Sequence, residues 1–146
     1  MGAADGGDSG VKWDEYIRAF GAALASIASF LWGGFDFILI VLLVAILLDY
    51  VSGIVVAALK KELSSKKGLA GMLKKVLYLL IVAVGQIVDT VMNAGGAIRG
   101  LVIGYLIANE GLSILENCAR GGAPVPKKLI DALEQLRGDD NDDKTV

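Results

Sequence analysis

Apolar residues in this chain gather in long blocks, and the longest runs from Phe35 to Leu59. Within that block, Asp49 is the one acidic or basic side chain between Asp36 and Lys60. A helix of about 20 apolar residues crosses the ~30 Å hydrocarbon layer of a bilayer, and this block is long enough to do so. The pattern therefore predicts a membrane span, and we expect a membrane protein.

Two shorter apolar blocks follow at 76–91 and 101–115, and the turn Asn93-Ala94-Gly95-Gly96 lies between them. Blocks of roughly 16 and 15 residues are short for a span, so flanking residues must extend both helices. The brief turn predicts a helical hairpin. Residues 35–120 are thus expected to form a three-span membrane domain.

The segment 13–34 is predicted to be an amphipathic helix. Apolar residues recur there at spacings of three and four, namely Trp13, Ile17, Phe20, Leu24, Ile27 and Leu31. The opposite face carries small residues, namely Gly21, Ala22, Ala25, Ser26 and Ser29. Small residues let helices approach closely in lipid. Two interpretations stay open: the helix lies on the membrane surface, or it is a conditional fourth span that inserts on assembly, hinged at Gly33 and Gly34.

Glycine and proline at 121–126 (GGAPVP) end the third span, and a short amphipathic helix is predicted over 127–137. Segment 121–137 is expected on the inner membrane face or against a neighbour. The ends 1–12 and 138–146 are rich in Gly and Asp, have little to bury and are predicted to be disordered. The predicted fold class is an all-α membrane protein with three transmembrane helices plus N-terminal and C-terminal amphipathic helices.

Loop charges predict the orientation in the membrane. Six lysines are assigned to the region between the first and second spans: Lys60, Lys61, Lys66, Lys67, Lys74 and Lys75. The turn between the second and third spans has only Arg99 beside it. An excess of Lys and Arg marks the cytoplasmic side. We therefore expect a multi-pass protein with its N-terminus outside and its C-terminus in the cytoplasm.

Composition removes several classes of function. The chain has no His and a single cysteine, Cys118, which excludes intramolecular disulfides, Cys/His metal sites and His-based catalysis. No nucleophile with a base and no phosphate-binding glycine loop is visible. We expect no enzymatic activity, no cofactor, no metal and no nucleic-acid partner. The acidic N-terminus lacks the basic region of a signal peptide, so insertion is expected to rely on the spans.

Ionisable residues inside a membrane are costly and are therefore candidates for a functional site. Asp49 lies eleven residues before the lysines that end its span, and Glu110 lies ten before Arg120. At ~1.5 Å per residue both acids should lie roughly 15 Å from the inner boundary, at nearly equal height. No basic residue is expected at that depth. Asp89 lies near the outer turn, where Arg99 is expected to pair with it across the hairpin.

Three interpretations of Asp49 and Glu110 stay open. The acids are protonated in a dry bundle, because burial disfavours the charged form; or they hydrogen-bond to neighbouring helices; or they face water in an assembled pore. The candidate partners for these hydrogen bonds are Ser52, Gln86, Asn109 and Ser113. Polar faces run along the second span (Gln86, Asp89, Asn93) and the third (Glu110, Ser113, Asn117). The pore candidates are Asp49, Gln86, Asp89, Glu110 and Ser113, and since three spans cannot enclose a wide channel, a water-facing stripe implies an oligomer.

Small residues at four-residue spacing mark two helix faces. Gly100, Gly104 and Ala108 form one ridge in the third span, and Gly53 and Ala57 form a shorter one in the first. Such spacing supports close helix crossings in membranes. These five residues are therefore the candidates for helix packing.

Several short elements occur together between Phe35 and Leu136. They are Asp49-Tyr50-x-Ser52-Gly53, the loop KELSSKKG at 61–68, Asn109-Glu110 with Ser113, Glu116-Asn117, and Pro126-Lys127-Lys128 at the start of the last helix. In combination they resemble the phage holin family that includes the clostridial toxin-secretion holins. The helix predicted over 13–32 is not part of this resemblance.

The resemblance implies a small protein that accumulates in the bacterial cytoplasmic membrane, forms a homo-oligomer in the lipid bilayer and permeabilises it at a set time. A cell-wall hydrolase (an endolysin), or a toxin, then leaves without needing to bind the holin directly. Two other classes stay open. One is a small ion- or proton-conducting channel or carrier component that uses Asp49 and Glu110; the other is a structural scaffold or antagonist of a pore.

Overall fold

The computed structural model describes residues 9–137, which form five helices and no strand. The helices are α1 (Ser9–Trp32), α2 (Phe37–Leu59), α3 (Ser65–Met92), α4 (Ala97–Arg120) and α5 (Lys127–Arg137). Three of them contain a stretch long and apolar enough to cross a membrane: Phe37–Leu59, Gly68–Met92 and Ala97–Arg120. The all-α class with three such helices is confirmed. Of the ends 1–12 and 138–146, which were predicted to be disordered, residues 1–8 and 138–146 lie outside the described residues. The prediction is wrong for residues 9–12, which form the first turn of α1.

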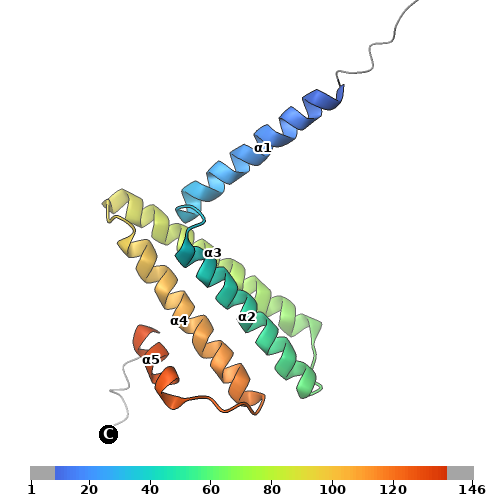
Figure 1. Ribbon diagram of the computed structural model, residues 1–146, viewed down its shortest axis with the longest axis vertical. Helices are drawn as coiled ribbons and strands as arrows, with labels where there is room; N and C mark the ends of the chain where they lie inside the picture. Colours follow the sequence, from blue (N-terminus) through green and yellow to red (C-terminus); the bar gives the residue numbers. More distant parts are fainter. Residues whose placement is uncertain (1–8, 138–146) are drawn as a thin grey trace, which may run out of the picture.

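Helices α2, α3 and α4 form the body of the molecule, α1 projects away from one end of it, and α5 folds back along α4 (Figure 1). The three body helices meet in an apolar core of Leu39, Leu42, Val82, Ile103 and Leu106. Their outward faces are also apolar, with Val44, Leu47, Leu77 and Leu101 among the exposed side chains. An apolar exterior of this extent suits lipid as the surrounding solvent.

Helix α3 begins at Ser65, eleven residues before the apolar block at Val76 that was predicted to open the second span. The residues between them include Leu69, Met72 and Leu73 and no proline, so the helix extends through them. Lys74 and Lys75 were predicted to lie in the loop before the second span. They lie inside α3 instead. This correction decides the chemistry of the bundle interior.

Helix α5 lies against α4 at a glycine. A Cβ placed on Gly111 would come within 3.0 Å of Leu133 Cδ1, so the missing side chain lets α5 approach. The turn before α5 contains Gly122 at φ +90, a conformation that glycine adopts without strain. The apolar side of this short helix is thus placed on the third span.

Helices α3 and α4 cross closely at Gly85. A Cβ at this position would lie 3.0 Å from Cγ2 and 3.3 Å from Cβ of Val102, whose branched side chain has little freedom to move. By contrast, a Cβ at Gly71, also in α3, would meet nothing within 4 Å. The two glycines form a matched pair for testing this crossing.

We expect Gly85→Ala to lower the free energy of unfolding by about 1–2 kcal/mol, because overpacking outweighs the better helix propensity of alanine. Gly71→Ala should raise it by up to ~1 kcal/mol. Thermal unfolding in detergent, followed by circular dichroism, measures both. Equal stability of the two variants would show that α3 and α4 do not cross at Gly85.

Candidate functional site

Three charged side chains, one from each body helix, meet inside the bundle. Lys75 Nζ of α3 lies 3.1 Å from Asp49 Oδ2 of α2 and also donates to Glu110 Oε1 of α4. The Glu110 side chain is fully buried, with 0% of its surface exposed. We call Asp49, Lys75 and Glu110 the Lys75 cluster.

The expectation that Asp49 and Glu110 have no basic residue at their depth is therefore wrong. It rested on placing Lys75 in the loop, whereas α3 begins ten residues earlier and carries Lys75 roughly 15 Å along its axis. The long lysine side chain then reaches between the two acids. Their predicted similar height is consistent with a single ammonium contacting both.

Amide and hydroxyl groups surround the Lys75 cluster. Asn117 Nδ2 donates to Asp49 Oδ1 at 3.2 Å and to Ser52 Oγ at 2.9 Å. Asn109 Nδ2 donates to the hydroxyl of Tyr78 at 2.7 Å, and the Tyr78 ring centre lies 4.9 Å from Lys75 Nζ. Asp49 is thus held by donors on both oxygens.

Glu110 is less completely paired. Its Oε1 accepts from Lys75, whereas its Oε2 is buried and has no hydrogen-bond partner among the described residues. Burying a polar atom without a partner costs free energy, and burying a charged one costs more. This oxygen is the electrostatically least favourable point of the cluster.

A pocket of about 430 Å³ leads from the α2–α3 loop towards Asp49. Its wall contains small residues (Gly53, Ala57, Gly68, Gly71) and polar or charged ones (Asp49, Glu62, Ser64, Ser113, Asn117, Arg120). The pocket exists in part because glycines have no side chains to fill it. The polar groups in its wall could form hydrogen bonds with water. Asp49 therefore lies on the wall of a hollow that opens at the lysine-rich end of the bundle.

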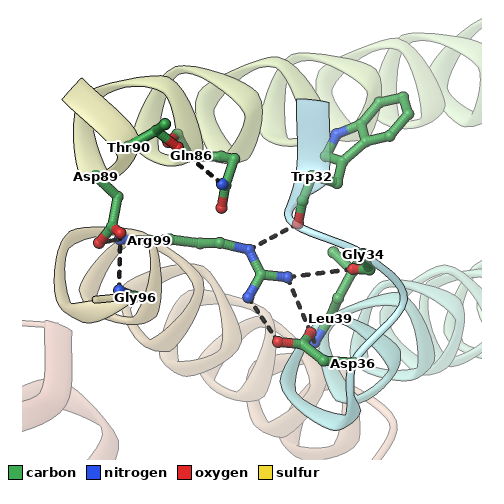
Figure 2. Close-up of polar contacts among 9 residues, drawn as sticks. All are labelled: Trp32, Gly34, Asp36, Leu39, Gln86, Asp89, Thr90, Gly96 and Arg99. Atoms are coloured by element: carbon green, nitrogen blue, oxygen red, sulfur yellow. Dashed lines mark hydrogen bonds and ion pairs between the residues drawn. The ribbon is translucent and has the colours of Figure 1, made fainter. Parts of the chain in front are cut away.

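A second polar cluster lies where α1 joins α2, around the buried side chain of Arg99, which we call the Arg99 clamp (Figure 2). Its Nε donates to the carbonyl oxygen of Trp32 at 2.7 Å. Its two terminal nitrogens donate to the two carboxylate oxygens of Asp36 at 2.7 and 2.9 Å. Trp32 Nε1 in turn donates to the carbonyl of Leu79 at 3.0 Å. The α1–α2 connection is thus fastened to both α3 and α4.

The predicted side-chain pair between Asp89 and Arg99 is not present, because the guanidinium turns to Asp36. Asp89 instead accepts from the backbone N–H groups of Gly96 (2.7 Å), Ile98 (2.8 Å) and Arg99 (3.3 Å). These donors are unpaired at the start of any helix, so Asp89 caps α4 and closes the hairpin. This structural role explains why an acidic residue lies near the end of the apolar helix α3.

The predicted pore candidates lie in different places. Asp49 and Glu110 belong to the Lys75 cluster, and Ser113 lines its pocket. Gln86 and Asp89 lie instead near the α3–α4 turn, where Gln86 Nε2 donates to Thr90 Oγ1 at 3.1 Å (Figure 2). The five residues therefore do not form one stripe within a single chain.

The small residues predicted for helix packing also separate. Gly53 faces α4, since a Cβ there would lie 3.7 Å from Asn117 Nδ2, and Ala57 lines the pocket. Ala108 is fully buried, whereas a Cβ at Gly100 or Gly104 would meet nothing within 4 Å. Gly100 and Gly104 thus leave a shallow place on α4 that none of the residues 9–137 fills.

Sequence reasoning missed Lys75, Asp36 and Trp32. Asp36 carried a local signal, since it immediately precedes an apolar block and accepts from Leu39 N at 3.2 Å as the N-cap of α2. Its partner Arg99, however, lies 63 positions away in the chain. No spacing rule connects two residues so far apart.

Hydrogen bonds and charge from Arg99 lower the pKa of Asp36 below its ordinary value of 3.8. A lowered pKa in the folded state stabilises the fold above the ordinary value, and that contribution is lost as the pH falls through the lowered pKa. We expect Asp36→Asn to flatten the decline of the melting temperature on acidification below about pH 3.8 in detergent. The exposed Glu62→Gln is the control, and an unchanged acid decline in Asp36→Asn would contradict the clamp.

Lys74 and Lys75 are neighbours in α3, but Lys74 is exposed. We expect Lys75→Met to lower the free energy of unfolding by about 3–5 kcal/mol, because it leaves Asp49 and the buried Glu110 without the ammonium group that contacts both. Lys74→Met should change it by less than ~1 kcal/mol. Unfolding curves of both variants, recorded in detergent, measure this difference. Similar free energies of unfolding for the two variants would place Lys75 outside the bundle.

Comparison with known proteins gives a consistent result. The profile of the bacteriophage holin family matches residues 26–138. A Clostridium perfringens protein described as an uncharacterized 14.9 kDa protein in the nagH 3′ region is 42% identical over 123 residues, which is 84% of this chain and 93% of its own length. A probable holin of Bacillus phage phi105 is 38% identical over 104 residues, 71% of this chain and 76% of its own.

Bacillus subtilis YtkC is 33% identical over 124 residues, covering 85% of this chain and 92% of its own length. No solved structure matches the chain. The family match extends from the second half of α1 to the end of α5 and confirms the resemblance noted in the sequence. This chain therefore belongs to the bacteriophage holin family.

Proposed function

We propose that this protein is a holin, which oligomerises in the bacterial cytoplasmic membrane and permeabilises it. A cell-wall hydrolase or a toxin would then leave the cell through the opening. Release of the hydrolase would cause lysis of the host. Membership of the holin family is the observation that carries the proposal. The phage phi105 relative bears the description of a probable holin, which agrees with it.

The packing of the body helices supports an oligomer. Leu42, Val82 and Ile103 have 0% exposed surface, so side chains fill the space between α2, α3 and α4. A chain packed in this way offers no wide passage along its own axis. A permeabilising opening would therefore form between copies and not through one.

The open surface on α4 is the proposed meeting place of copies. Gly100 and Gly104 lie one helical turn apart with free space above them, and exposed Leu101 and Tyr105 follow each of them. Small residues allow a helix from a second chain to approach closely, where van der Waals packing drives association in lipid. The other predicted packing residues are already engaged within the chain.

Charge near the helix ends supports the proposed orientation. Lys60, Lys61 and Lys66 lie at the α2–α3 connection, and Arg120 lies at the end of α4 on the same side of the bundle. The positive-inside rule would put this end in the cytoplasm, with α1 and the Arg99 clamp at the outer face. The pocket beside Asp49 would then open to the cytoplasm.

An ion- or proton-conducting component is the second candidate, and the Lys75 cluster favours it. Buried ionisable residues in spans often mark ion or proton pathways. The two functions differ in the size of what passes. A conducting component passes small ions and retains folded proteins, whereas a holin releases both.

We expect vesicles that contain the purified chain to release a small dye and, above a threshold protein density, an enclosed folded enzyme. Inducible expression in bacteria should release a cytoplasmic reporter when a cell-wall hydrolase is co-expressed. Dye release without enzyme release at every density would favour the conducting component. Retention of both cargoes would contradict the holin.

We expect Gly104→Leu to slow enzyme release from vesicles by about tenfold, equivalent to ~1.4 kcal/mol of lost association. The matched control is Val84→Leu, which enlarges an exposed apolar side chain of α3. Release rates at equal protein-to-lipid ratio measure the effect. If the two variants release the enzyme equally fast, copies do not meet at Gly104.

A further inference from the structure

The Lys75 cluster places one cation against two carboxylates. If Asp49 and Glu110 were both ionised, the cluster would carry an uncompensated negative charge within the candidate spans. Charge without a partner in such surroundings is strongly unfavourable. One further positive charge is needed to balance the cluster.

The hydrogen bonds indicate where that charge binds. Asp49 Oδ1 accepts a hydrogen bond from Asn117, and Asp49 Oδ2 lies against the ammonium group of Lys75. Donors on both oxygens suit an ionised carboxylate. Glu110 receives Lys75 on Oε1 only, and its buried Oε2 has no partner among the described residues. A proton on Oε2 would neutralise this oxygen while Oε1 continued to accept from Lys75.

A proton fits better than a metal ion. A bound metal cation requires several oxygen ligands around it. Residues 9–137 bring together no three His, Cys, Asp or Glu side chains that could hold one. A proton needs a single oxygen.

We propose that Glu110 Oε2 is a proton-binding site, supplied from the α2–α3 loop side through the pocket beside Asp49. The bond that forms is Oε2–H and the bond that breaks is an O–H bond of hydronium in the pocket, which leaves neutral water; the charge of the cluster rises by one. Asp49 lines the pocket and Lys75 bridges it to Glu110, so the pocket comes within one side chain of Glu110.

The charged and titratable groups that face Glu110 or its approach come from α2, α3, the loop between them and the end of α4. Asp49 of α2, Lys75 and Tyr78 of α3, and at the pocket mouth Glu62 and Arg120, face the site or its approach. On the α5 side, Leu133 lies against Gly111, while the charged residues Glu116, Glu134 and Arg137 line a separate hollow. The immediate surroundings of Glu110 thus contain one cation and one other carboxylate.

Infrared spectroscopy of the full chain in phosphatidylethanolamine–phosphatidylglycerol vesicles tests the site, since a protonated carboxyl has its own C=O stretching band. We expect this band at neutral pH, its loss on titration to alkaline pH, and its loss in Glu110→Gln. The exposed Glu116→Gln should keep it. Absence of the band at neutral pH, or its survival in Glu110→Gln, would overturn the proposal, as would its displacement by sodium at constant pH.

A second variant keeps the test decisive if Glu110→Gln does not fold, which circular dichroism would show. In Asp49→Asn the ammonium of Lys75 is left to Glu110 alone, so Glu110 ionises and the neutral-pH band disappears. A band that persists unchanged in Asp49→Asn contradicts the proposal. The spectrum does not depend on leakage, so it separates this site from the proposed holin function.

The supply route is tested by thiol accessibility in a Cys118→Ser background. Ser113→Cys, which lines the pocket, should react with a membrane-impermeant thiosulfonate at least about tenfold faster than lipid-facing Val44→Cys, because the reactive thiolate forms in water. Equal, slow reaction at both positions would overturn the pocket as the route.

Discussion

The contacts of Lys75 with Asp49 and Glu110 are the interaction on which the bundle interior depends. Each of the three body helices contributes one charged side chain, so the cluster fixes their relative rotation as well as their depth. In a bilayer a lysine turned outward would face hydrocarbon, and Asp49 and Glu110 would lose the cation that both contact. The cluster therefore favours one arrangement of α2, α3 and α4 over alternatives that apolar packing alone would tolerate.

The remaining polar contacts fasten the other end of the bundle. Asp89 caps α4, and Arg99 joins the α1–α2 connection to the body through Trp32 and Asp36. Between the two polar clusters lies the apolar core, and outside it an apolar surface. Polar groups inside and apolar groups outside are what a membrane protein needs when lipid replaces water as the solvent.

The sequence predicted the helix class and the three spans because apolar block length is set by bilayer thickness, a constraint that acts locally. It also singled out Asp49 and Glu110, since ionisable residues stand out in apolar blocks. It placed Lys75 wrongly, because a lysine pair before an apolar block looks the same whether the helix starts there or ten residues earlier. The pairing of Arg99 with Asp36 depends on tertiary packing, which no local pattern contains.

We propose that the membrane opens at contacts between copies, since side chains fill the interior of each three-helix body. Single-vesicle fluorescence measures this most directly, by counting labelled chains through stepwise photobleaching while recording the loss of an enclosed dye from the same vesicle. We expect vesicles with one chain to retain their dye and leakage to begin only above a minimum number of copies. Leakage from vesicles holding a single chain, or retention at every copy number, would contradict it.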